Sequence, residues 1–332
     1  MRVLSLIQPT GDVHLGGYLG ALRGWAARQH DHDAFHGMAD LHALTVDHDP
    51  AELARRTLDL ATILLAVGLD PDACTLFVQS HVHEHAELAW LMECTVSVGE
   101  LRRMTQFKDK SAGQESVSGG LFSYPALMAA DILLYDADRV PVGDDQRQHL
   151  ELTRDLAQRF NHRYGPTFVV PEAAVPEVGA RVMDLQDPTR KMSKSGESPQ
   201  GTISVLDPPE VIERKFRRAV TDTGTEVAYD PATKPGVSNL LEILGAATGA
   251  SPEQAAAGYA GSGYGALKSD VAAAVVEMLR PVQERHSELA ADPGAVAEVL
   301  AKGAAKATAV ASATSARAAD AVGLLAPLGG RR

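Results

Sequence analysis

Short apolar runs alternate with amphipathic segments along the first half of the chain. The apolar runs predict strands, and the stretches between them repeat apolar residues at helical spacing. The predicted strands are Val3–Ile7, Ala34–Met38, Thr75–Gln79, Arg139–Val142 and Thr167–Val170. The predicted helices are Leu15–Gln29, Pro50–Val67, Glu84–Val98, Tyr124–Tyr135 and Gln146–Asn161. Strands that alternate with helices indicate an α/β fold with a Rossmann-like parallel sheet.

Beyond about Gly196 the strand signals thin out and helical patterns dominate, with prolines at the changeover. The predicted helices there are Pro208–Val220, Val237–Thr248, Pro252–Tyr259, Tyr264–Leu289 and Pro293–Val322. We therefore expect a Rossmann-like domain over residues 1–195, with inserted helices over about 84–135, and a mostly helical domain over 196–332. The last helix is expected to pack back on the first domain.

Composition narrows the class of protein. A chain of 332 residues with 45% hydrophobic residues can form two domains with a large core. No secretory signal pattern or apolar run long enough to cross a bilayer is evident, so we expect a cytoplasmic protein without a membrane partner. Two cysteines, Cys74 and Cys94, do not suggest a structural zinc site or a disulfide framework. The net charge of −12 argues against a general nucleic-acid binder, although basic stripes occur at Arg102–Lys110 and Arg214–Arg218.

A glycine-rich string, His14-Leu15-Gly16-Gly17, stands where the first predicted strand turns into a helix. Backbone N–H groups and the positive end of a helix can face a phosphate there, which predicts an anion site. The alternative is that the glycines merely permit a tight turn, and this would be the better interpretation if the string stood alone.

A second string, Lys191-Met192-Ser193-Lys194-Ser195, places two ammonium groups and two hydroxyls within five residues. Such a set suits a polyphosphate whose negative charge grows as it leaves. The alternative, a solvated basic loop, carries less weight because the glycine string occupies the matching N-terminal position.

Together the two strings resemble the paired signatures of class I aminoacyl-tRNA synthetases. Further segments look like those of the bacterial tryptophanyl-tRNA synthetases, and the resemblance covers nearly the whole chain. These segments are 7–11, 40–43, 99–108, 124–133 and 141–146. The tyrosyl-tRNA synthetases share the Gly-x-Asp-Gln loop at 143–146, but the helix containing Met128-Ala129-Ala130-Asp131 does not resemble their tyrosine pocket.

The resemblance implies an enzyme that activates L-tryptophan with ATP and passes it to the 2′-hydroxyl at the end of tRNA(Trp). Magnesium would arrive with ATP, no structural metal is expected, and a homodimer would form through the segment after Glu84. Residues 196–332 would be the anticodon-binding domain. The resemblance implies that the catalytic residues are His14, Lys110, Lys191 and Lys194. ATP-binding roles fall on Gln8, Thr10, Gly16, Gly17, Gly143, Asp145, Val182, Met192, Lys191, Ser193, Lys194 and Ser195.

Substrate choice can also be argued from the residues. An indole offers one polar group, its N–H donor, so a pocket that rejects phenylalanine needs one buried acceptor among apolar walls. Asp131 can supply that acceptor, because Tyr124, Met128 and Asp131 share one helix face. The alternative is a carboxylate that caps or pairs within the core. The predicted tryptophan-binding residues are Leu4, Leu6, Gln8, His42, Tyr124, Met128, Asp131, Val140, Val142 and Gln146.

The sequence departs from the family pattern at four positions near these sites. Leu4 stands where Phe is usual, Leu6 where Gly is usual, Gly17 where Asn or His is usual, and Leu41 where Gln is usual. We predict an auxiliary enzyme that tolerates tryptophan analogues. Alternative functions are a tyrosyl-type specificity, a synthetase-like binding or regulatory protein with impaired catalysis, and a small-molecule nucleotidyltransferase. Tryptophan-dependent ATP–pyrophosphate exchange would distinguish them.

Overall fold

A parallel five-stranded sheet forms the centre of the first half of the molecule. The computed structural model describes residues 1–113, 116–141, 143, 146–174, 181–193 and 198–328. The strands run in the order β3-β2-β1-β4-β5, and all neighbours are parallel. Their bounds are β1 Arg2–Ile7, β2 Asp33–Met38, β3 Thr75–Val78, β4 Arg139–Pro141 and β5 Glu172–Ala174. The predicted fold class is confirmed.

Alternate residues of the strands feed two hydrophobic clusters, one on each face of the sheet. On one face Trp25 stacks on His36, and Leu22 and Met38 join a cluster with helices α2 and α4. On the other face Leu4 and Phe77 pack with helices α5 (Glu84–Glu93), α8 (Gly119–Leu134) and α9 (Arg147–Tyr164).

The helices of this half are α1 Leu15–Gly17, the π-helical η1 Tyr18–Leu22, α2 Arg23–Arg28, α3 Asp40–Ala43, α4 Pro50–Ala66, the 3-10 turn η2 Gln79–His81, α5 Glu84–Glu93, α6 Val98–Arg103, α7 Thr105–Ser111, α8 Gly119–Leu134 and α9 Arg147–Tyr164.

The fifth strand differs from the prediction. Residues 167–170 are not a strand, because the Asn161 side chain takes over their backbone groups: its Oδ1 accepts from Thr167 and Phe168, and its Nδ2 donates to Phe168. Pro171 follows and cannot donate to a sheet. The strand that pairs with β4 begins one residue later, at Glu172.

Helices in two regions also differ from the predictions. The expected helix Glu84–Val98 ends at Glu93, because Ser97 caps a new helix, α6, through the backbone N–H of Glu100. The expected helix Tyr124–Tyr135 starts earlier, at Gly119, where the Ser118 side chain accepts from Leu121.

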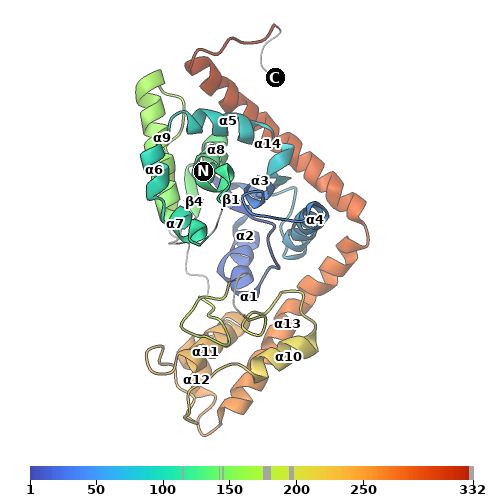
Figure 1. The fold of residues 1–332 in the computed structure, drawn as a ribbon. Helices are drawn as coiled ribbons and strands as arrows, with labels where there is room; N and C mark the ends of the chain where they lie inside the picture. The colour runs from blue at the N-terminus through green and yellow to red at the C-terminus, as the bar shows by residue number, and fades with distance from the viewer. Residues whose placement is uncertain (114–115, 142, 144–145, 175–180, 194–197, 329–332) are drawn as a thin grey trace.

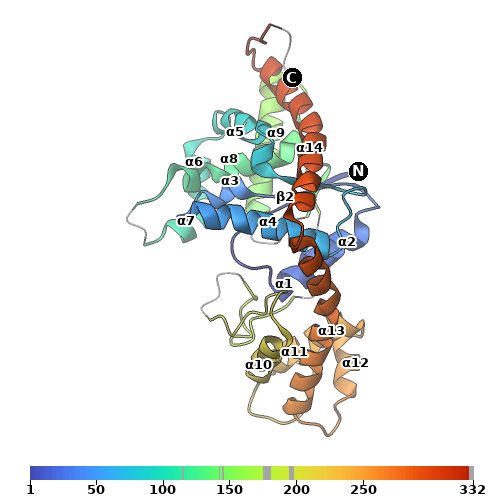
Figure 2. The same ribbon diagram turned by 90° about the vertical axis from the view of Figure 1, so that its right-hand side faces the viewer.

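The described helices after residue 196 are α10 Pro209–Arg217, α11 Pro235–Thr248, α12 Pro252–Ala257, α13 Tyr264–Ala290 and α14 Pro293–Ala321. Helix α13 lies with α10–α12 at one end of the molecule, and α14 runs from there along the sheet to α5 (Figures 1 and 2). Helix α14 packs against β3, the outermost strand on that side. No helix in the described parts of the chain combines the length and apolarity that a membrane crossing requires.

Candidate active site

The glycine string forms the start of the helical segment after β1. His14 has extended backbone and caps α1, since its Nδ1 accepts from the Gly17 N–H at 3.1 Å. A Cβ at Gly16 would lie 3.2 Å from His14 Nδ1, so glycine leaves room for the capping ring. The Leu15 N–H donates to Ile203 at 2.8 Å. Two of the amides expected to face a phosphate are therefore engaged within the protein.

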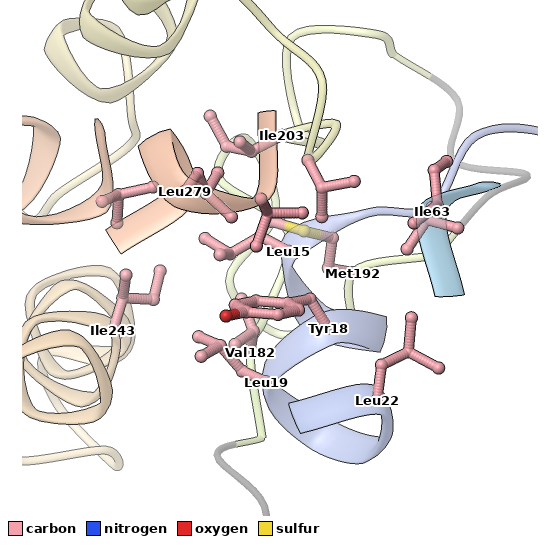
Figure 3. Close-up of a cluster of buried hydrophobic side chains, with 14 of the residues drawn as sticks. Leu15, Tyr18, Leu19, Leu22, Ile63, Val182, Met192, Ile203, Ile243 and Leu279 are labelled. Atoms are coloured by element: carbon pink, nitrogen blue, oxygen red, sulfur yellow. The ribbon is translucent and has the colours of Figure 1, made fainter. Parts of the chain in front are cut away.

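The two signature strings lie next to each other. The segment around the glycine turn pairs with residues 203–205, because Val205 also donates to the Val13 carbonyl at 2.9 Å. A Cβ at Gly16 would lie 3.5 Å from Met192 Cβ. Leu15, Met192 and Ile203 share one hydrophobic cluster (Figure 3). The structure therefore joins the glycine turn to the lysine-rich string through a common core.

Val182 and Met192, predicted near adenine, form a backbone pair in which the Met192 N–H donates to Val182 at 3.1 Å. Both side chains are buried in the cluster of Figure 3. Lys191 pairs with Met183 across the same bridge, and the Ser193 carbonyl accepts from Thr202. Four predicted site residues lie outside the described residues: Val142, Asp145, Lys194 and Ser195.

Asp131 lies at the centre of a buried hydrogen-bond network. Its side chain is 1% exposed, and three donors reach it: His42 Nε2 lies 2.7 Å from Oδ2, while Gln79 Nε2 and His85 Nδ1 lie 2.7 and 2.6 Å from Oδ1. Burial alone would raise the pKa of Asp131, but the charge and hydrogen bond of His42, with the hydrogen bond of His85, hold it well below its usual range. The side chain is therefore a carboxylate, which can accept one more N–H.

Aromatic and basic side chains lie beside this network. The rings of Tyr124 and His42 are 6.1 Å apart, edge to face, and the Tyr124 hydroxyl lies 2.8 Å from His149 Nε2. Lys110 places its Nζ 5.5 Å from the centre of the Tyr124 ring. The structure thus brings Lys110, a predicted catalytic residue, to the predicted tryptophan-binding group.

Apolar residues predicted to form the tryptophan pocket surround the same region. Leu4 and Val140 are buried together with Phe77, and Met128 is partly buried against that cluster. Leu6 lies over Gly37, its partner in the sheet: a Cβ at Gly37 would be 2.3 Å from Leu6 Cδ2. Of the remaining predicted residues, Gln8 and Thr10 follow β1, and Gly143 accepts at 2.9 Å from the backbone of Gln146.

Four residues of this candidate site were not predicted from the sequence: Gln79, His85, Tyr135 and His149. A partial signal was present, because Gln79 is the last residue of a predicted strand and Tyr135 lies one helical turn beyond Asp131. Nothing local links Gln79 or His85 to the carboxylate.

The second basic stripe is not a uniform surface. Lys215 is buried, and its Nζ donates to Asp207 at 2.6 Å and to Thr202 at 2.8 Å, whereas Arg214 and Arg217 are exposed. Among the described residues, no group of three or more His, Cys, Asp or Glu side chains is placed to hold a metal ion.

Comparison with known proteins gives a consistent result. The family model for class I tRNA synthetases (W and Y) matches residues 1–280. The chain is 56% identical over 337 aligned residues to tryptophan–tRNA ligase 1 of Streptomyces coelicolor, with 100% of this chain and 99% of the relative covered.

Solved structures agree. Tryptophanyl-tRNA synthetase from Mycoplasma pneumoniae superposes with a TM-score of 0.89 at 40% identity, covering 98% of both chains. The Campylobacter jejuni enzyme, complexed with ADP and tryptophan, superposes with a TM-score of 0.85 at 34% identity, covering 98% of this chain and 100% of that one. These relatives support the tryptophan interpretation and not the tyrosyl or impaired alternatives.

Proposed function

Since the chain belongs to the family of class I tRNA synthetases for tryptophan and tyrosine, we propose which side chains select tryptophan, bind ATP and contact tRNA when tRNA is charged with tryptophan. The enzyme activates tryptophan with ATP, which yields tryptophanyl-adenylate and pyrophosphate, and then transfers tryptophan to tRNA(Trp). The tryptophan carboxylate attacks the α-phosphate in line, so the protein contributes mainly position and charge.

Asp131 selects the amino acid, and its buried carboxylate is the single observation that carries this assignment. The indole N–H donates to the carboxylate, while Leu4, Met128 and Val140 provide apolar contact. A phenylalanine ring would leave the buried carboxylate without this donor, and such an unmet acceptor gives strong discrimination. Gln8, Tyr124 and Gln146 hold the ammonium and carboxylate groups of tryptophan, and His42 lines the pocket edge.

The glycine turn and the lysine-rich string hold ATP. Met192 lies against Gly16, and this contact supports the proposal that both strings face one nucleotide. His14 and Gly16 approach the phosphates, and the Gly143–Asp145 loop holds the ribose. Lys191 and Lys194 stabilise the negative charge that develops on the departing pyrophosphate. Lys110 adds positive charge from its position beside Tyr124. Magnesium enters bound to ATP as part of the substrate.

Transfer to tRNA requires surfaces beyond the pocket. Arg102, Arg103 and Lys108 are exposed on α6 and α7 and can contact phosphates of the tRNA. The helical region after residue 196 reads the anticodon. Trp90 and Val98, which are 64% and 58% exposed, are apolar side chains that could contact a second copy of the chain. We place the enzyme in the cytoplasm.

The first test is ATP–pyrophosphate exchange driven by tryptophan. Asp131→Ala should raise the KM for tryptophan by roughly 10- to 100-fold and weaken discrimination against phenylalanine, with ATP affinity unchanged. Lys194→Ala should lower turnover by about a hundredfold while tryptophan still binds. Circular dichroism controls for folding. An Asp131→Ala enzyme that loses tryptophan and ATP affinity equally, or a Lys194→Ala enzyme with normal turnover, would contradict the corresponding assignment.

A further inference from the structure

Two residues hold the side of the Asp131 carboxylate that faces away from His42. Gln79 Nε2 and His85 Nδ1 both donate to Oδ1, at 2.7 and 2.6 Å. A carboxylate oxygen accepts about two hydrogen bonds, so Oδ1 is saturated. Oδ2 receives one bond, from His42, and keeps capacity for another.

Contacts with Tyr135 and Phe77 fix the orientation of the His85 ring. Since a carboxylate cannot donate, Nδ1 of His85 carries the proton, and its Nε2 lies 2.8 Å from the Tyr135 hydroxyl. Burial, with the nearby charge of Asp131, raises the pKa of Tyr135, so that hydroxyl keeps its proton and donates to Nε2. Phe77 stacks on the His85 ring with centroids 5.9 Å apart. Rotation of His85 would break both hydrogen bonds and this packing.

We propose that His85, supported by Tyr135, is a positioning and specificity-determining residue that orients Asp131 so that Oδ2 accepts the indole N–H. This inference rests on the proposed role of Asp131 as the indole acceptor. His85 does not touch the substrate. It occupies Oδ1, which leaves Oδ2 available, and it keeps Oδ2 directed at the indole N–H. This strengthens selection for an aromatic ring that bears an N–H.

The test compares tryptophan with 3-benzothienylalanine, an isostere whose sulfur replaces the indole N–H. In exchange assays His85→Leu should lower kcat/KM for tryptophan by roughly 10- to 100-fold and leave that for the isostere within about threefold. His85→Asn, whose amide can still donate near Oδ1, should recover most of the preference. Tyr135→Phe should give a smaller loss of the same kind.

His36→Leu is the matched control. His36 is also a buried histidine, but it lies on the opposite face of the sheet, where it stacks on Trp25 and neither ring nitrogen has a hydrogen-bond partner among the described residues. Its replacement should leave the preference for tryptophan over the isostere unchanged.

Equal losses for both amino acids in His85→Leu, or an unchanged preference, would overturn the proposal. If that variant does not fold, Tyr135→Phe decides: a reduced tryptophan preference supports the proposal, and an unchanged one overturns it. Asp131→Ala, which removes both acceptor oxygens, separates this from the proposed function. A preference that survives Asp131→Ala means that Asp131 is not the acceptor. A preference lost in Asp131→Ala but kept in His85→Leu overturns only the positioning role.

Discussion

Asp131 illustrates what one charged residue requires inside an apolar cluster. Removing a carboxylate from water costs several kcal/mol, which only close donors can offset. Here the donors come from His42 on α3, Gln79 after β3 and His85 on α5. The position of this buried carboxylate therefore depends on residues from three elements besides the helix that bears it.

At this scale the sequence could predict only part of the site. Tyr124, Met128 and Asp131 could be placed on one face because helical spacing is local. Gln79 and His85 could not be linked to Asp131, which lies 52 and 46 residues away along the chain. Hydrogen bonds between distant elements leave no periodic pattern, and they depend on how the elements pack.

Departures from the family pattern lead to a prediction about inhibitors. Leu6 fills the space over Gly37, and Leu41 donates its backbone N–H to Gln79 at 3.1 Å. We expect an indole-containing tryptophan analogue that reaches towards ATP to inhibit this enzyme more weakly than a family member with the usual Phe, Gly, Asn and Gln, because the analogue depends on those contacts more than tryptophan does. Inhibition constants measured in tryptophan exchange check this.

Gly17 offers a single-residue control. Its φ is −69°, and a Cβ there would meet no atom closer than 3.8 Å, so Gly17→Asn fits without strain. Gly17→Asn should strengthen inhibition by the analogue towards that of the comparison enzyme, while the KM for tryptophan stays within about twofold. Equal inhibition of this enzyme and the comparison enzyme would leave the four departures without a role in analogue tolerance.

At the scale of elements, local signals predicted most strands and the long helices. The apolar runs at β1, β2 and β3 and the prolines that begin α12 and α14 are such signals. The short helices α3 and α7, of four and seven residues, were missed because they are too short to show a period. The expected strand at 167–170 failed because a side chain, Asn161, competed for the backbone.

A salt bridge between helices α6 and α9 gives a pH-dependent prediction. Arg159 contacts both oxygens of Glu100, at 2.6 and 3.0 Å. This bond is the largest cause that lowers the pKa of Glu100 to about 2, below the ordinary 4.5. The stabilisation is complete above 4.5 and is lost as pH falls through 2. Glu100→Gln should reduce the free energy of unfolding by ~1 kcal/mol at about pH 7, since partial exposure weakens the pair.

Urea unfolding at about pH 7 and about pH 3.5 measures that difference, which should shrink at the lower pH. Glu277→Gln is the control, because the Glu277–Arg280 pair lies on the surface and should contribute little at either pH. A difference between Glu100→Gln and wild type that stays constant across this range would contradict the assignment.

At the scale of the whole molecule, one hydrophobic cluster extends from the glycine turn into the helical region. It contains Leu15 and Met38 from the first half, and Leu240 and Leu279 from α11 and α13 (Figure 3 shows part of it). Sequence patterns predicted the two regions, with a division near residue 196. They could not predict that the regions share a core, because each apolar face is compatible with many partners.

Helix α14 connects the two regions, and its closest approach to the sheet is at a glycine. A Cβ at Gly303 would lie 1.8 Å from the Leu76 carbonyl oxygen in β3. Gly303→Ala should therefore force the helix outward and reduce the free energy of unfolding by ~2–4 kcal/mol. Gly265→Ala, at an open position in α13, should be neutral or slightly stabilising. Thermal and urea unfolding compare them, and equal effects would show that α14 does not pack this closely.

The position of α14 in the chain also matters while the protein is being made. Helix α14 comes long after β3 in the chain, and β3, the strand that it packs against, is the outermost on its side of the sheet. A ribosome releases β3 long before α14, so the outer backbone groups of β3 can meanwhile pair with a strand of another nascent chain. Protection against such aggregation is completed only once α14 has been made, and a message cut short before α14 yields a sheet with an open side.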